Sequence, residues 1–256
     1  GFIQTETPWF GLEKNGAENI RATALLVGIW FLVFSIPLFI FTSDKTKSDS
    51  TLTSNILNGL KSLIITFKKA KENIEILKYL IARMIYTDGL NTLFAFGGIY
   101  AAGSFGFSLS EIILFGIAIN LTAGLGAALF ASVDDLIGPK KTILISLLAL
   151  SILGACMVIV ESKTLFWTFG LTLGVFVGPA QSASRSLMAR LAPEESRAEM
   201  FGLYAFSGKA TAFLGPAILG VVTDTLESQR AGVATIIIFF VVGGIAMYFI
   251  KEPIRS

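Results

Sequence analysis

Four polar side chains occur inside long apolar stretches of the sequence, where such groups are rare. Asp88 and Lys209 are ionisable, and Asn91 and Asn120 carry amides. With a helix rise of 1.5 Å per residue, all four would lie at one depth, roughly 15 Å inside a membrane. Because a lone charge there costs at least about 2.5–3.5 kcal/mol, Asp88 and Lys209 would stabilise one another by pairing. We expect these residues and Gln181 to line a substrate or proton pathway; the alternative is a structural ion pair that fixes helix packing.

The composition is typical of an integral membrane protein. Apolar residues make up 54% of the 256 residues and charged residues only 15%, whereas soluble domains carry about a quarter. A span needs about 20 apolar residues. We therefore expect an all-α, polytopic bundle of seven transmembrane helices, over residues 22–42, 78–102, 109–132, 142–160, 165–188, 200–223 and 232–250.

The spans differ in where charges occur. The first, fourth and seventh contain no ionisable side chain, whereas the others contain Arg83, Asp88, Glu111, Arg185 and Lys209. A helix that faces lipid excludes charge, and a helix that lines a wet cavity can retain it. The pattern indicates that every third helix faces lipid and that the others surround a polar pathway.

Lys and Arg are distributed unequally between the two sets of loops. On one side they total twelve: Lys45, Lys47, Lys61, Lys68, Lys69, Lys71, Lys140, Lys141, Arg190, Arg197, Lys251 and Arg255. On the other side they total four: Lys14, Arg21, Lys163 and Arg230. Because cytoplasmic loops are enriched in Lys and Arg, we expect a cytoplasmic C-terminus and an N-terminus outside.

The long segment 43–76 divides the chain. From Ile56 onward its apolar residues recur at helical spacing with lysines between them. We expect a cytoplasmic linker with an amphipathic helix on the inner membrane surface; the alternative is a linker helix without a regulatory role. It separates residues 1–42, an extracytoplasmic segment and one span, from residues 77–256, a six-helix unit. The chain opens without an initiator Met, and we expect it to be a piece of a longer protein.

The sequence offers little for catalysis or metal binding. It contains no His, and its single cysteine, Cys156, lies inside an apolar span. The commonest metal ligand and the commonest acid–base group are therefore absent, and no disulfide can form within the chain. We expect no enzyme activity, no metal or other cofactor, and no nucleic-acid partner.

Glycines recur every four residues in the fifth span. Gly170, Gly174 and Gly178 form a smooth stripe that another helix can approach closely. Pro179 follows and weakens the local helix hydrogen bonding. Two interpretations remain open: a bending or gating point next to Gln181, or tight static packing.

The loop after the third span resembles the signature of the major facilitator superfamily. It reads Ala131-Ser-Val-Asp134-Asp135-Leu136-Ile-Gly138-Pro-Lys140-Lys141. The superfamily has Gly in place of Ala131 and a basic residue in place of Leu136, so part of its charge network is missing here. The resemblance implies that this loop clamps neighbouring helices at an inner gate, with Asp134, Asp135, Gly138, Lys140 and Lys141 as the gate residues.

Three charges near the ends of spans are ambiguous. Arg83 and Arg185 lie towards the inner edge, where each could join the inner gate or snorkel to lipid headgroups. For Arg83 a gate role would involve pairing with an acidic loop residue. Glu111 lies near the outer edge, and we expect it to be an interfacial charge.

Three longer stretches resemble the bacterial subfamily related to the autophagy-type vacuolar amino-acid effluxers. They are residues 86–92 (YTDGLNT), 178–193 (GPAQSASRSLMARLAP) and 201–211 (FGLYAFSGKAT). The resemblance implies a transporter of two six-helix halves, each built from inverted three-helix repeats around a midplane site. This chain would be the sixth helix, the central loop and the second half. It further implies alternating access, efflux of amino acids or similar zwitterions with a possible coupling proton, and a bacterial plasma membrane location.

Two other functions fit seven helices with an intramembrane Lys and Asp. In a retinal photoreceptor or pump, Lys209 would form the Schiff base and Asp88 would be its counter-ion, but the lysine would be expected on the last helix rather than the sixth. A membrane receptor or scaffold that transports nothing is the other alternative.

Overall fold

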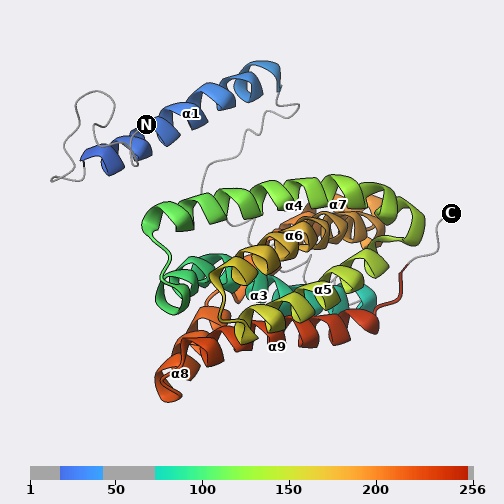
Figure 1. Cartoon of the computed structure of the whole chain (residues 1–256). Helices are drawn as coiled ribbons and strands as arrows, with labels where there is room; N and C mark the ends of the chain where they lie inside the picture. Colours follow the sequence, from blue (N-terminus) through green and yellow to red (C-terminus); the bar gives the residue numbers. More distant parts are fainter. Residues whose placement is uncertain (1–17, 43–72, 253–256) are drawn as a thin grey trace. The chain divides into compact units, whose positions relative to one another are not determined.

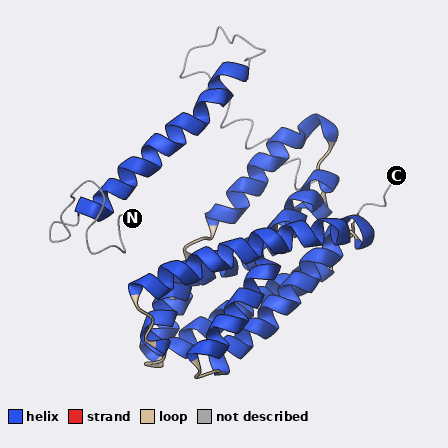
Figure 2. Cartoon of the chain, turned by 45° about the horizontal axis from the view of Figure 1, so that its top comes forward, coloured by secondary structure: helices blue, strands red, loops and turns tan. Residues whose placement is uncertain are grey.

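The computed structural model describes residues 18–42 and 73–252, and every regular element in these ranges is helical (Figure 1, Figure 2). The amphipathic helix expected within 43–76 lies almost wholly outside the described residues. The chain divides into two units, Gly1–Ile56 and Leu57–Ser256. Helix α1 (Glu18–Phe41) belongs to the first unit, and helices α3 to α9 belong to the second.

Helix α1 has the dimensions and surface of a membrane span. Its 24 residues correspond to a length of about 36 Å, which exceeds a hydrocarbon core of about 30 Å. Apolar side chains are exposed along it, including Trp30, Phe31, Leu38 and Phe39. A helix that is apolar on every side is typical of a membrane span.

The second unit is a bundle of rods. Five of them are single helices: α3 (Ile74–Phe105), α4 (Leu109–Ile137), α5 (Pro139–Ile159), α6 (Lys163–Leu191) and α9 (Gln229–Tyr248). The remaining rod consists of η2 (Glu194–Ser196), α7 (Arg197–Ala210) and α8 (Leu214–Thr225). Helix α4 packs along α6, α3 packs along α9, and α5 contacts both α6 and α9 (Figure 1).

Five of the described segments have the length and hydropathy of a membrane span: α1, α4, α5, the rod from η2 to α8, and α9. Helices α3 and α6 are also long enough, with 32 and 29 residues, but they contain more polar side chains. The chain is therefore a helical membrane bundle, and the count of seven crossings stays a prediction.

The rod expected to be one continuous span over 200–223 is broken, which corrects the sequence prediction. Helix α7 ends at Ala210 and α8 begins at Leu214. Pro216 cannot donate a hydrogen bond, and its ring would clash with the carbonyl of Ala212 in a continuous helix. Because the first N–H groups of a helix have no partner within it, Pro216 is tolerated in the first turn of α8.

Helices α5 and α9, which we expected to face lipid, are each buried on one side only. Leu148 and Ile152 are exposed on α5, and Ile238 and Ile245 are exposed on α9. These positions are separated by four and seven residues, so each pair lies on one helix face. Neither helix is enclosed on all sides, which agrees with the expected contact with lipid.

The glycine stripe of α6 packs against α4. A Cβ atom at Gly170 would overlap the Phe115 ring, one at Gly174 would overlap the Thr122 hydroxyl, and one at Gly178 would overlap the Ala123 carbonyl. Small residues at such positions let helix backbones approach closely. Helix α6 runs unbroken through Pro179, so the geometry agrees with close packing, and bending at this proline stays a prediction.

Candidate substrate cavity

A cavity of about 260 Å³ lies between α3, α6 and α7. It brings together three of the predicted pathway residues, Asn91, Gln181 and Lys209. Arg83 and Arg185, which we had considered for the inner gate, also line this cavity. Polar side chains from three helices therefore converge here, although their sequence positions are far apart.

Arg83 joins α3 to α7. Its Nη1 donates hydrogen bonds to the Tyr204 carbonyl oxygen at 2.6 Å and to Ser207 Oγ at 2.8 Å. Its guanidinium also lies 3.5 Å from the centroid of the Tyr204 ring, a cation–π contact. Gly208 permits this approach, because a Cβ atom there would lie 2.7 Å from Nη1. The pairing of Arg83 with an acidic loop residue, one of the two roles considered for it, does not occur among the described residues.

Two tyrosines of α3, which the sequence analysis did not single out as site residues, connect α3 to α6 beside the cavity. Tyr79 Oη donates to the Ser184 carbonyl oxygen at 2.6 Å, and Tyr86 Oη and Ser184 Oγ share a hydrogen bond of 2.7 Å. Both tyrosines are buried. Tyr79, Arg83 and Tyr86 are spaced by four and then three residues, which places them on one face of α3. This spacing is the sequence signal that would have identified the polar face of α3 beside the cavity.

The remaining cavity residues are less constrained. Asn91 Nδ2 donates to the Gly208 carbonyl oxygen at 3.3 Å. Arg185 and Lys209 are exposed within this unit, and neither forms an ion pair with another described residue.

Asp88 does not pair with Lys209, and that prediction is wrong. The Asp88 side chain is 2% exposed, and its Oδ2 accepts a hydrogen bond of 2.9 Å from the Gly215 N–H in the first turn of α8. Its Oδ1 is buried without a partner among the described residues. The helix break explains the difference, because it creates free N–H groups and a positive helix end beside Asp88.

Asn120 also lies apart from the cavity. Its Nδ2 donates to the Gly116 carbonyl oxygen at 2.8 Å, within its own helix, and its side chain is exposed. A pathway role for Asn120 therefore stays a prediction.

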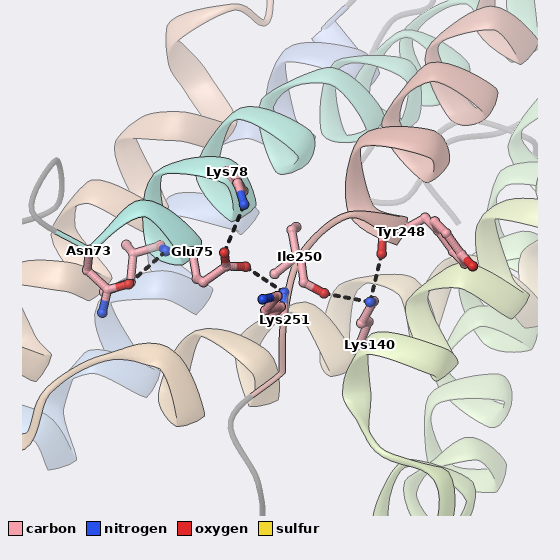
Figure 3. A network of polar contacts seen from close by, with 8 residues as sticks. Asn73, Glu75, Lys78, Lys140, Tyr248, Ile250 and Lys251 are labelled. Carbon is pink, nitrogen blue, oxygen red and sulfur yellow. Dashed lines mark hydrogen bonds and ion pairs between the residues drawn. The ribbon is translucent and has the colours of Figure 1, made fainter.

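The predicted inner-gate loop meets the end of α9 (Figure 3). Lys140 Nζ donates to the carbonyl oxygens of Tyr248 and Ile250, where the negative end of the helix dipole favours a cation. Glu75, in the first turn of α3, accepts hydrogen bonds from the Lys251 N–H and from Lys78 Nζ. The Lys251 N–H first, and then Lys78, lower the pKa of the Glu75 carboxyl.

Helix α6 contributes a third contact to this segment. Arg190 Nη1 forms an ion pair of 3.0 Å with Glu252 Oε1. We call the contacts of Glu75, Lys140 and Arg190 with residues 248–252 the C-terminal clasp. The sequence analysis identified Lys140 of this set and missed the other two.

The other predicted gate residues lie beside the clasp or apart from it. Gly138 has a φ of 89°, in the region that favours glycine, and a Cβ atom there would lie 3.1 Å from the Glu252 carboxylate. Asp134 Oδ1 is buried without a hydrogen-bond partner in the described part of the chain. Asp135 precedes this turn, in the last turn of α4, and Lys141 follows it, in the first turn of α5. Their gate role stays a prediction.

The described helices form a membrane bundle with polar side chains around a cavity between them. The sequence pattern of the family described as "Vacuole effluxer Atg22 like" matches residues 6–253. The chain belongs to this family.

Curated relatives carry names that agree with this class. "Uncharacterized MFS-type transporter YxiO" of Bacillus subtilis (strain 168) is 22% identical over 229 residues, which cover 89% of this chain and 53% of that protein. "Autophagy-related protein 22" of Yarrowia lipolytica is 24% identical over 245 residues, covering 83% of this chain and 41% of the relative. The protein of the same name from Saccharomyces cerevisiae (strain S288c) is 24% identical over 252 residues, covering 85% and 48%. The chain spans about half the length of these relatives.

Proposed function

We propose that this chain is part of a secondary active transporter of the major facilitator type, which moves a small polar solute, such as an amino acid, by alternating access. The observation that carries the proposal is the polar cavity between α3, α6 and α7 in an otherwise apolar bundle. Polar and ionisable side chains inside a membrane mark pathways. The description of the family as effluxers supports efflux as the direction.

Residues 77–256 would be one half of this transporter, with α3–α5 and α6–α9 as inverted repeats. The packing supports this division, because the two repeats exchange partners symmetrically: α6 packs against α4 and α5, whereas α3 packs against α7, α8 and α9. Such an exchange is expected when a pseudo-two-fold axis relates the repeats. Residues 1–42 would supply a helix of the other half, and residues 43–76 would be the cytoplasmic linker.

The break between α7 and α8 supports a binding site at this level. Transporter sites form at discontinuous helices, whose free backbone groups can contact solutes and ions. Here the break directly follows Lys209. Asp88 holds the start of α8 through Gly215, and we assign it the role of positioning α8.

We assign the inner gate to the C-terminal clasp. It joins the ends of α3, α5 and α6 to the end of α9 through Glu75, Lys140 and Arg190. Opening the inner side requires these ends to separate, so the clasp would favour the inward-closed state. The loop charges support a cytoplasmic C-terminus, and the similarity to a Bacillus subtilis protein supports a bacterial plasma membrane.

Reconstitution of the full-length protein into liposomes tests the proposal. We expect saturable flux of a radiolabelled small solute, above that of protein-free liposomes and dependent on an imposed proton gradient. Lys209→Gln should abolish the flux. Arg197→Gln, which removes an exposed cation paired with Glu194 outside the cavity, should retain it. Flux equal to that of protein-free liposomes for every solute would reject transport and favour the receptor or scaffold.

The retinal alternative lacks its counter-ion, since Asp88 contacts Gly215.

A further inference from the structure

The charges that line the cavity are all of one sign. Arg83 from α3, Arg185 from α6 and Lys209 from α7 contribute three cations. None of the described residues that line the cavity is acidic. The other polar groups at the wall, such as Asn91, Gln181 and Ser184, are neutral.

The ion pairs between described residues use other cations than those of the cavity. These pairs, each between two described residues, are Glu75–Lys78, Glu111–Lys163, Glu252–Arg190, Glu194–Arg197 and Glu161–Arg230. None of them includes a cavity cation. Asp88, on the same helix as Arg83, directs Oδ2 to the Gly215 N–H. The described residues therefore leave the positive charge of the cavity uncompensated.

One edge of the Arg83 guanidinium carries a donor that no described residue accepts. Its Nη1 is occupied by Tyr204 and Ser207. Its Nε is buried and has no hydrogen-bond partner among the described residues. Nε–H and Nη2–H point along the same edge of a guanidinium, and this pair of parallel donors matches the two oxygens of a carboxylate or phosphate group. The Tyr204 and Ser207 contacts hold the guanidinium in a fixed orientation, so this edge is pre-organised.

We propose that the cavity binds a small organic anion through a carboxylate or phosphate group held by Arg83, Arg185 and Lys209. This inference rests on the proposed transport function and names the class of solute. It narrows the small polar solute proposed above to one with net negative charge, because recognition of a neutral zwitterion such as a neutral amino acid needed Asp88 beside Lys209, and Asp88 contacts Gly215 instead. An ammonium group in this cavity would face three cations and no described carboxylate, whereas an anion would offset the like-charge repulsion. The volume of about 260 Å³ lies just below the roughly 300–1,000 Å³ range of drug-sized pockets and suits a small metabolite.

Thermal stabilisation of the purified full-length protein in detergent tests the charge preference. The panel contains succinate, glycerol 3-phosphate, glutamate, glutamine and lysine at equal concentration and ionic strength. Glutamate and glutamine form a matched pair, because they differ in size very little and in charge by one unit. We expect at least one of the three anions to raise the melting temperature in a saturable way, and glutamine and lysine to leave it unchanged. Stabilisation by succinate alone would identify a carboxylate, and by glycerol 3-phosphate alone a phosphate; either outcome supports an anion site.

Variants connect the stabilisation to the cavity. Arg185→Gln and Lys209→Gln should each weaken anion binding at least about tenfold, and the charge-preserving Arg185→Lys and Lys209→Arg should restore most of it. Arg197→Gln should bind as the unchanged protein does, and size-exclusion profiles check that each variant is folded. If glutamine or lysine raises the melting temperature and the three anions do not, the anion proposal is overturned and the transport proposal stands. Anion binding that is equal in all these variants would place the site elsewhere and overturn the assignment. Absence of binding across the panel would overturn the anion proposal, and the liposome flux decides separately whether transport stands.

Discussion

Two charged residues of α3 hold the two parts of the broken rod. Arg83 donates to the Tyr204 carbonyl oxygen on α7, and Asp88 accepts from the Gly215 N–H on α8. Each charge therefore meets a backbone group of the complementary sign, and Asp88 lies at the positive end of a helix. At the scale of single residues, both charges position the helices on either side of the break, and Arg83 also lines the cavity.

The capping role of Asp88 predicts a graded effect of substitution. Asp88→Asn retains an oxygen that can accept from Gly215, whereas Asp88→Ala leaves that buried N–H without a partner. Loss of a side-chain cap costs about 0.5–2 kcal/mol. We expect Asp88→Ala to unfold at a lower temperature than Asp88→Asn, measured by thermal denaturation in detergent. Equal melting temperatures for both variants would contradict the capping role.

At the scale of helices, the bundle relies on two kinds of contact. Helices α4 and α6 approach closely along Gly170, Gly174 and Gly178, where the helix backbones pack against one another. The C-terminal clasp joins helix ends by polar contacts at the surface, which break at lower energy than packed backbones. This difference suits a rigid α4–α6 pair and a clasp that opens during transport.

The packing surface predicts opposite effects for two glycines. Gly178→Ala forces a methyl group into the backbone of Ala123, and overpacking of this kind costs about 1–3 kcal/mol. At Gly124, on the partner helix α4, a Cβ atom meets nothing within 4 Å. Gly124→Ala should therefore be neutral or slightly stabilising, because alanine favours helix. Thermal denaturation of the two variants measures the difference, and a stable Gly178→Ala protein would refute the packing.

The clasp predicts a pH dependence at acidic pH. Its contacts lower the pKa of the Glu75 carboxyl below the ordinary 4.5. A lowered folded-state pKa gives stability that is present above about pH 4.5 and is lost as the pH falls through the folded-state value. The melting temperature should exceed that of Glu75→Gln near pH 7, and the difference should shrink below about pH 4.5. The control Glu195→Gln, outside the clasp, should show no such trend. A difference that grows on acidification would contradict this sign.

At the scale of the molecule, the sequence predicted the class of protein and most helix positions. These depend on local composition, because a lipid environment demands long apolar helices. The sequence analysis placed one continuous span over 200–223, although Gly215-Pro216 raised the question of a bend there, and the break lies just before these residues. The partner of Asp88 was missed because depth along a helix does not specify which way a side chain points. The spacing of Tyr79, Arg83 and Tyr86 predicts which face of α3 lies at the cavity, whereas the estimated membrane depth of Lys209 did not predict its neighbours.

The family match agrees with the predicted class, and the cavity changes the expected recognition. Sequence reasoning paired a carboxylate with an ammonium because isolated charges are costly in a membrane. The structure pairs Asp88 with a helix end and groups Lys209 with two arginines. Three-dimensional proximity between α3, α6 and α7 was needed to see that group.

Cysteine labelling in the full-length protein tests most directly whether water reaches this cavity inside the membrane. In a Cys156→Ser background, single cysteines would replace Lys209 or Gln181 at the cavity and Leu148 or Ile245 on the exposed sides of α5 and α9, which we expect to face lipid. Because a thiol reacts as its thiolate, which forms in water and not in lipid, a charged, membrane-impermeant reagent should label Lys209→Cys and Gln181→Cys. It should leave Leu148→Cys and Ile245→Cys unmodified until detergent is added. Protected cavity positions together with labelled α5 and α9 positions would contradict the account.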